Sequence, residues 1–406
     1  MSNVATANDD TELYEAEEKQ HFRFDIQGLR ALAVILVILG HAKTPHFTGG
    51  YIGVDVFFVI SGFVITGLLL RQAQGSVLRN LGKFYSRRIR RIMPAATLVM
   101  IGTALAAYQW LGPFSAVPIL ADLHWASLFS ANFHLIHVGQ DYFSQGLPPS
   151  LLTHYWSLAV EEQFYFVFPL ILFVLGAIVG LRRHRVALSA ILVAIVAASA
   201  IWSVMETNAN PISAYFSPLT RFWELGFGAL LASLPSSLQI KNKIVVAVGG
   251  WIALAVIIAA AMTLPDTSGV APGWKMWLAV APTGFLLFSG GTTSLGAPSG
   301  WFSLQPLKYI GDISYSLYLF HFAWLNVPLQ YAQLKYGITT ELSGTARVLQ
   351  VLGALACAVA SYHLFENPIR RSKWLDRHPQ LTALLGAALI GLTWLTAYLL
   401  GKYWTI

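Results

Sequence analysis

The polar residues of this sequence that could do chemistry lie beside long apolar stretches. Arg30 and His41 bracket the first such stretch, eleven residues apart, which is about three turns of an α-helix. Both side chains are therefore expected on one helix face, about 16 Å apart along its axis. A histidine can act as a general base at neutral pH. The structural alternative is an arginine that reaches lipid phosphates and a histidine that ends the helix.

Two carboxylates accompany this pair. Asp55 opens the second apolar stretch, in GVDVFFVISGF at 53–63, close to the expected level of His41, where it could orient the imidazole. Glu161 lies in HYWSLAVEEQFY at 154–165 and could accept a proton or bind sugar hydroxyls. The structural alternatives are a helix-dipole interaction for Asp55 and interfacial glutamates in an aromatic belt for 161–162.

Four arginines crowd into five residues after the second apolar stretch. They are Arg87, Arg88, Arg90 and Arg91, in YSRRIRRIMP at 85–94. The planar guanidinium suits bidentate phosphate binding, so the cluster is a candidate site for a phosphorylated ligand. A stop-transfer signal that anchors the chain to lipid headgroups is the structural alternative.

Other polar residues are weaker candidates. Arg221 and Glu224 are three residues apart and are expected to neutralise each other, and we interpret His321 as a structural residue. The sequence lacks the GxxxxGK[ST], GxSxG and HExxH motifs, which removes the usual support for ATP-driven transport and for common hydrolases. His134 and His137 lack a suitably spaced carboxylate or thiolate, so no metal site is expected.

The elements that must position these residues follow from composition. Of 406 residues, 56% are hydrophobic and only 11% are charged, whereas soluble domains are about a quarter charged. So few charges cannot supply a water-facing surface, which indicates that the chain lies in a bilayer. The single cysteine excludes an intramolecular disulfide framework.

Apolar stretches of about 20 residues, long enough to cross a bilayer, recur along the chain. We therefore predict an all-α membrane helix bundle of about eleven transmembrane helices, within a range of 10–12. The stretch 116–137 is interrupted by charged and histidine residues, so we interpret it as an interfacial or re-entrant helix, with a twelfth span as the alternative. The predicted spans are 27–45, 52–70, 92–112, 163–181, 186–204, 215–234, 243–263, 274–290, 311–333, 345–366 and 380–400.

Charge distribution predicts the orientation. With the N-terminus inside, the cytoplasmic segments carry nineteen Lys and Arg and the opposite side carries five. The positive-inside rule then places the N-terminus in the cytoplasm and, after an odd number of spans, the C-terminus outside. Residues 1–22 are rich in acids and are expected to form a disordered cytoplasmic tail, and 23–406 to form one transmembrane domain.

Seven motifs, in this order, resemble those of the acyltransferase 3 family, whose members are membrane acyltransferases of surface polysaccharides, lipids and some antibiotics. The resemblance covers about residues 24–371. The motifs are Arg30-x10-His41, GVDVFFVISGF at 53–63, FYSRRIRRIMP at 84–94, WSLAVEEQFY at 156–165, RFWELGFG at 221–228, YIGDISYSLYLFH at 309–321 and YHLFENPIR at 362–370.

The resemblance implies transfer of an acyl group, usually acetyl, from cytoplasmic acyl-CoA to a hydroxyl of a surface glycan, a glycolipid or a similar acceptor. It implies a multi-pass protein of the plasma membrane that contacts lipids, without nucleic acid or metal. Larger relatives append an SGNH domain, which we do not find in this sequence.

The resemblance also assigns roles to residues. His41 is expected to be the general base, oriented by Asp55 or Glu161, with an acyl-imidazole at His41 as the alternative mechanism. Glu161 is preferred over Glu162. The donor is expected to bind at six further positions and at the motif tyrosine: Arg30, Ser61, Arg87, Arg88, Arg90, Arg91 and Tyr85.

Two other classes of function remain open at this point. A transporter or flippase could use the same buried polar residues as a solute path, and it would be favoured by inverted repeats or paired broken helices, which we do not find. A membrane scaffold without chemistry would tolerate the change His41→Ala.

Overall fold

The computed structural model describes residues 23–71, 77–143, 150–179, 181–290, 296–337 and 340–404. Within these ranges all regular elements are helices and no residue is in a β-strand. The prediction of an all-α fold is therefore confirmed. The expected acidic tail at 1–22 lies outside the described residues.

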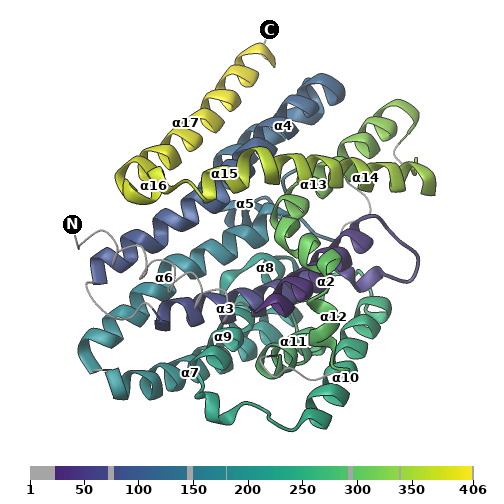
Figure 1. Cartoon of the computed structure of the whole chain (residues 1–406). Helices are drawn as coiled ribbons and strands as arrows, with labels where there is room; N and C mark the ends of the chain where they lie inside the picture. The colour runs from purple at the N-terminus through teal and green to yellow at the C-terminus, as the bar shows by residue number, and fades with distance from the viewer. Residues whose placement is uncertain are drawn as a thin grey trace.

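Long helices make up the bundle, and short helices connect them (Figure 1). The long helices are α2 (Phe24–His41), α3 (Gly53–Arg71), α4 (Val77–Ser127), α6 (Tyr155–Val179), α7 (Leu181–Ala209), α9 (Pro218–Ser233), α10 (Lys243–Thr263), α11 (Trp277–Ser289), α13 (Gln305–Tyr336), α14 (Gly344–Ser361) and α17 (Pro379–Trp404). The short ones are η1 (Thr48–Ile52), α5 (Ala131–His137), α8 (Pro211–Phe216), η2 (Ser236–Leu238), η3 (Trp274–Met276), α12 (Pro298–Phe302), the π-helical turn η4 (Tyr362–Glu366), α15 (Asn367–Arg370) and α16 (Lys373–Arg377).

Within the described residues, eight helical stretches are long and apolar enough to cross a membrane, which makes the chain a multi-pass membrane protein. Helices α9, α11 and α13 coincide with the other predicted spans but are not among these eight. The count of eleven spans therefore stays a prediction. The eight stretches are Phe24–His41, Thr48–Arg71, Arg79–Gly112, Tyr155–Val174, Val186–Ala209, Lys243–Thr263, Gly344–Arg377 and Pro379–Tyr403.

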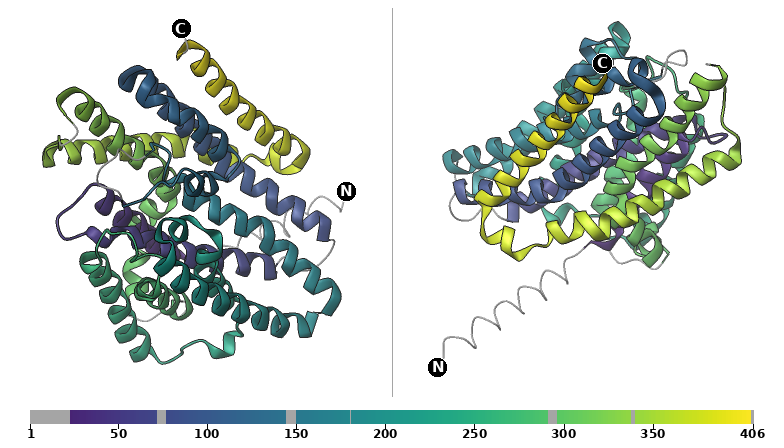
Figure 2. Two further views of the ribbon diagram at one scale, coloured as in Figure 1. Left: turned by 180° about the vertical axis from the view of Figure 1, so that it is seen from behind. Right: turned by 90° about the horizontal axis from the view of Figure 1, so that it is seen from above.

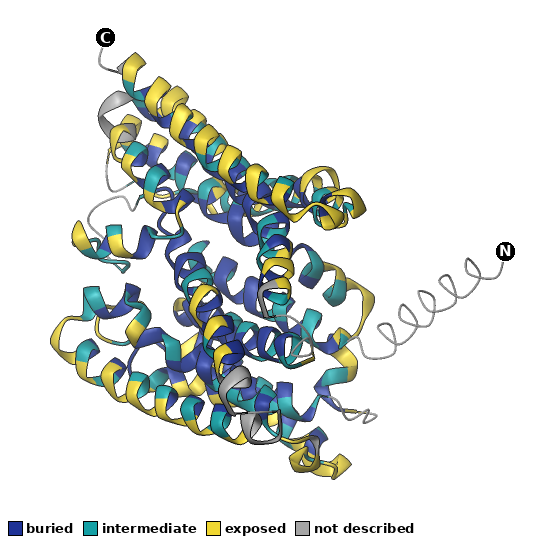
Figure 3. Ribbon diagram, turned by 90° about the vertical axis from the view of Figure 1, so that its left-hand side faces the viewer, coloured by how far each residue is buried: buried dark blue, intermediate teal, exposed yellow. Residues whose placement is uncertain are grey.

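The distribution of side chains suits a lipid environment. Large apolar side chains such as Val193, Ile252, Leu349 and Leu384 are exposed, and exposed residues line the outer helices in Figure 3. Fully buried positions in the interior include charged residues, Arg221 among them. Because lipid chains solvate the apolar outer face, the interior is free to hold polar groups that pair with one another.

The stretch 116–137 forms the part of α4 after its kink and the short helix α5. Helix α4 continues through it to Ser127 after a kink at Gly112, whose φ of 72° a glycine adopts without strain, and α5 follows at Ala131–His137. The second half of α4 runs beside α17, as both views of Figure 2 show. None of the eight candidate spans in the described residues includes 116–137, so the interpretation as an interfacial or re-entrant helix, with a twelfth span as the alternative, stays a prediction.

Helix α2 positions the first candidate pair. It packs against α3 and α13, and Gly28 on α2 allows the backbone of Phe302 to approach closely, since an added Cβ would lie 2.2 Å from the Phe302 carbonyl oxygen. Arg30 lies in the second turn of α2 and His41 is its last residue. The two side chains therefore lie at different depths of the bundle, as the spacing predicts.

Glycines also let α3 and α9 pack closely. An added Cβ would lie 1.8 Å from the Leu225 carbonyl oxygen at Gly62, and 2.0 Å from the Val59 carbonyl oxygen at Gly228. Small residues at such crossings let helix backbones approach within a membrane. These contacts hold α3, which lines the site described below, against α9.

We expect Gly228→Ala to lower the thermal stability of the protein, although alanine favours helices by about 1 kcal/mol. Overpacking of this kind costs about 1–3 kcal/mol. The matched control is Gly102→Ala in α4, where an added Cβ meets nothing within 4 Å and stability should be equal or higher. Thermal unfolding in detergent compares the two, and a Gly228→Ala protein as stable as Gly102→Ala would contradict the packing argument.

Candidate active site

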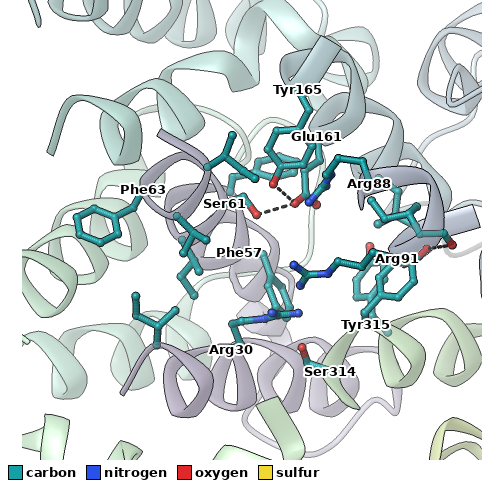
Figure 4. Close-up of a pocket in the computed structure, with 18 of the residues that line it drawn as sticks. Arg30, Phe57, Ser61, Phe63, Arg88, Arg91, Glu161, Tyr165, Ser314 and Tyr315 are labelled. Atoms are coloured by element: carbon teal, nitrogen blue, oxygen red, sulfur yellow. Dashed lines mark hydrogen bonds between the residues drawn. The ribbon is translucent and has the colours of Figure 1, made fainter. Parts of the chain in front are cut away.

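A cavity of about 350 Å³ lies among α2, α3, α4, α6 and α13 (Figure 4). Its walls contain Arg30, Ser61, Arg88, Arg91 and Glu161, which the sequence singles out, from four different helices. The rest of the lining is largely apolar and aromatic. Its other members include Val54, Phe57, Phe58, Phe63, Ser157, Tyr165, Ser314, Tyr315 and Tyr318.

Arg30 and Arg91 are guanidinium groups inside this cavity without a partner among the described residues; Arg71, at the exposed end of α3, also lines the cavity and is likewise unpaired there. Arg30 and Arg91 point into the same space in Figure 4, and neither makes a hydrogen bond or an ion pair with another described residue. A charge within a membrane span costs about 2.5–3.5 kcal/mol even on the lenient insertion scale. Two adjacent unpaired cations therefore indicate a site for an anionic or strongly polar ligand.

Glu161 lines one wall of the cavity, and its neighbour Glu162 pairs with another lining residue, Arg88. Ser61 donates a hydrogen bond of 2.6 Å to Glu161, and the Tyr165 hydroxyl donates a second one. Arg88 pairs with Glu162 at 2.5 Å, and its guanidinium lies 3.8 Å from the centre of the Tyr165 ring. Ser61 and Arg88 are thus fixed at the wall, and Arg23 pairs with Asp25 at 2.7 Å. The cations of the lining without a partner among the described residues are Arg30, Arg91 and the exposed Arg71.

A second cavity of about 710 Å³ adjoins the first and shares Val64, Ile65, Arg88 and Arg91 with it. We call the cationic lining of this second cavity the basic mouth. Asp376 is the only acidic residue in the lining. The basic mouth consists of Arg87, Arg88, Arg90, Arg91, Arg370, Arg371, Lys373 and Arg377.

The residues of the basic mouth differ in role. Arg90 is buried and pairs with Asp376 at 2.5 Å, and it also donates to the Ser372 carbonyl oxygen at 3.0 Å. It therefore connects α4 to α16.

Tyr85, which was expected to bind the donor, lies outside both cavities. Its hydroxyl donates a hydrogen bond of 2.9 Å to the Phe166 carbonyl oxygen.

Sequence reasoning used the basic residues of 370–377 only as topology markers. The structure brings them beside the arginines of α4, almost three hundred positions away, through the turn that follows η4. Four positive charges within eight residues were a signal, but only the fold shows that they share a cavity with 87–91.

His41 lies in a chain of hydrogen bonds with residues from two distant segments. Its Nδ1 lies 2.9 Å from Nε2 of His321 on α13, and its Nε2 lies 2.7 Å from the Tyr142 hydroxyl. The Nδ1 of His321 lies 2.5 Å from the Tyr318 carbonyl oxygen. We call Tyr142, His41, His321 and the Tyr318 carbonyl the histidine chain.

These contacts correct the expected surroundings of His41. Both ring nitrogens are taken by Tyr142 and His321, whereas Glu161 binds Ser61 and Tyr165. Asp55 instead accepts a hydrogen bond of 2.9 Å from Arg221. The expectation that Asp55 or Glu161 orients the imidazole is therefore not supported by any hydrogen bond in the described residues. Asp55 accepts from Arg221 instead, and Glu161 accepts from Ser61 and Tyr165.

Arg221 lies at the centre of a fully buried ionic cluster. It contacts Asp55 and also Glu224 at 3.0 Å, as the i, i+3 spacing predicts, and its guanidinium lies over the rings of Trp156 and Tyr215. The cluster fixes α3 to α9. Such a cluster is costly to break, because removal of one partner leaves a buried charge unpaired.

Tyr318 separates the cavity from the histidine chain. Its side chain lines the cavity, its hydroxyl is bonded to Ser157 at 2.7 Å, and its ring centre lies 5.4 Å from that of His321. Only the Tyr318 side chain therefore lies between this part of the cavity and His321. His41 itself is not in the cavity wall.

Tyr142 is the other terminal residue of the histidine chain, at Nε2 of His41. It lies in the segment between α5 and α6, where its ring stacks on Tyr215 at 4.3 Å. Burial raises the pKa of Tyr142 to about 12, so the phenol is protonated at neutral pH and can donate to Nε2 of His41. Neither Tyr142 nor its role was predicted, since no motif marks it.

Comparisons with known proteins show which proteins this chain is similar to. The family model Acyl_transf_3, described as an acyltransferase domain, matches residues 23–363. Peptidoglycan O-acetyltransferase OatA of Listeria monocytogenes is 30% identical over 360 residues, which cover 86% of this chain and 56% of the relative. O-acetyltransferase OatA of Staphylococcus aureus strain NCTC 8325 is 31% identical over 361 residues, covering 85% and 57%.

The chain thus spans little more than half the length of these curated relatives. No solved structure matches it. Within the described residues, no group of three or more His, Cys, Asp and Glu side chains is arranged to hold a metal ion.

Proposed function

This chain belongs to the acyltransferase 3 family, and from that premise we propose that it transfers an acyl group, in the simplest case acetyl, from acyl-CoA to a hydroxyl group. The O-acetyltransferase names of its relatives support this reaction class. The observation that carries the proposal is the pair of joined cavities, which leads from the basic mouth, past the unpaired Arg30 and Arg91, to Tyr318 beside the histidine chain.

The shape and charge of these cavities suit a coenzyme A thioester. Its phosphate groups would bind at the basic mouth, where arginine forks give bidentate contacts. The largely apolar cavity beyond would hold the pantetheine arm, with Arg30 and Arg91 as hydrogen-bond donors along it. The arm would then bring the thioester toward the end of α2 where His41 lies.

We propose that His41 is the general base. Its Nε2 would take the proton of the acceptor hydroxyl while that oxygen attacks the thioester carbonyl carbon. As the new C–O bond forms, the C–S bond breaks, and the thiolate of coenzyme A receives the proton from the imidazolium. For this, the acceptor hydroxyl must replace the Tyr142 hydroxyl at Nε2.

The acceptor is proposed to be a glycan, glycolipid or similar hydroxyl compound reached from the outer face of the plasma membrane. One relative is named for peptidoglycan, which makes a cell-wall glycan the first acceptor to try. The excess of Lys and Arg supports a cytoplasmic N-terminus and basic mouth, with the C-terminus outside.

Thermal unfolding with added nucleotides tests the donor site. A ligand that binds only the folded state stabilises it by RT ln(1 + [L]/Kd), so acetyl-CoA and coenzyme A should raise the melting temperature in a dose-dependent way. Two other ligands should protect less. Coenzyme A that lacks the 3′-phosphate loses one phosphate for the basic mouth, and ATP lacks the pantetheine arm for the apolar cavity. Equal protection by ATP, or none by any of the four, would contradict the proposal.

A further inference from the structure

His321 is the member of the histidine chain to which sequence reasoning gave a purely structural role. It is fully buried on α13, and its two ring nitrogens contact two different groups, the Tyr318 carbonyl oxygen and Nδ1 of His41. A histidine that only fills space needs no such pair of partners. The two contacts together determine where the protons lie.

The proton positions follow from the one partner that cannot donate. A carbonyl oxygen only accepts, so Nδ1 of His321 must carry a hydrogen for its contact with Tyr318. In a neutral ring, Nε2 of His321 is then an acceptor. The contact at 2.9 Å therefore requires that Nδ1 of His41 donates.

The same reasoning extends to the reactive side of His41. With its hydrogen on Nδ1, a neutral His41 presents a lone pair on Nε2. The Tyr142 hydroxyl, 2.7 Å away, donates to this lone pair. All the hydrogen bonds of the chain thus run in one direction, from Tyr142 to the Tyr318 carbonyl.

We propose that His321 is a positioning residue that holds His41 in the Nδ1–H tautomer, so that Nε2 is free to accept the proton of the acceptor hydroxyl. The inference rests on the proposed function, in which His41 is the base. His321 takes the place that a carboxylate has in hydrolase triads, where it fixes the tautomer and orientation of the catalytic histidine. A neutral imidazole suits this buried site, because a carboxylate would need further partners for its charge.

Two variants separate tautomer control from packing. His321→Leu fills a similar volume but offers Nδ1 of His41 no acceptor, whereas His321→Gln keeps an amide oxygen that can accept and an amide N–H that can donate to Tyr318. We expect kcat for acetyl transfer to fall by about 100-fold or more in His321→Leu, since loss of the orienting group in a triad costs up to about 10⁴-fold. The KM for acetyl-CoA should change little, and His321→Gln should recover much of the rate.

Nitrogen-15 NMR of the protein with labelled histidine gives a readout that needs no acceptor. The His41 signals, assigned by their loss in His41→Ala, should show hydrogen on Nδ1 in wild type and His321→Gln and a lost preference in His321→Leu. Exposed His137 offers the control His137→Gln, with wild-type kcat. Hydrogen on Nε2 of His41 in wild type would overturn the proposal even if His321→Leu failed to fold, as would wild-type kcat in His321→Leu. Wild-type activity in His41→Ala would instead overturn the proposed function.

Discussion

Replacement of His41 by alanine is expected to lower kcat for acyl transfer from acetyl-CoA by about 10²-fold to 10⁴-fold, the usual contribution of a general base. The imidazole is the only titratable side chain in the last turn of α2, and its two ring nitrogens contact Tyr142 and His321. Because His41 lies outside the cavity wall, affinity for coenzyme A should stay close to that of wild type. Initial rates of thiol release, together with coenzyme A binding, check both parts.

The control for this experiment is His137→Gln, since His137 is an exposed histidine at the end of α5. It should keep wild-type rates. If His41→Ala retained the wild-type kcat, His41 would not be the base. If it lost coenzyme A binding as well as rate, the histidine would belong to the donor site rather than to the chemistry.

Replacement of Arg91 by glutamine is expected to raise the KM and Kd for acetyl-CoA by about 10-fold to 100-fold, since a charge-assisted hydrogen bond contributes about 1.5–3 kcal/mol. Arg91 lines both cavities and makes no ion pair with another described residue. Its charge is therefore available to the ligand. Arg30→Gln should act in the same direction, because Arg30 also lines the first cavity and has no partner among the described residues.

The matched control is Arg79→Gln, an exposed arginine on the same helix that lines neither cavity. Titration calorimetry or radioligand binding should give it the wild-type affinity. Added salt should weaken binding to the wild type through screening at the basic mouth. Equal losses in Arg91→Gln and Arg79→Gln would show a general charge effect, which would contradict a specific donor site.

Much of the fold could be predicted because the bilayer imposes local rules. Apolar length predicts the long helices, and the spacing of Arg30 and His41 predicts their different depths on α2, because both signals lie within one helix. The kink at Gly112 and the continuation of α4 to Ser127 could not be predicted in the same way. His124 and Asp122 interrupt the apolar pattern there, but they do not end the helix.

The part of the candidate site that lies within one helix could also be predicted. The arginines of 87–91 form a local cluster, and their number alone suggested a phosphate site. Contacts between distant segments could not be predicted from the sequence, since 280 positions separate His41 from His321 and 166 separate Asp55 from Arg221. Asp55 was placed beside His41 because both are near one loop, yet in a buried setting the carboxylate pairs with the guanidinium, which compensates its charge.

Acetyl transfer by the purified protein in lipid nanodiscs tests the central claim most directly. The measurement follows coenzyme A thiol release and ester formation with labelled acetyl-CoA and de-O-acetylated peptidoglycan fragments as acceptor. We predict that thiol release and ester appear together in wild type and His137→Gln, and that both are lost in His41→Ala. Thiol release in His41→Ala at the wild-type rate, or no release above background in wild type, would contradict the account.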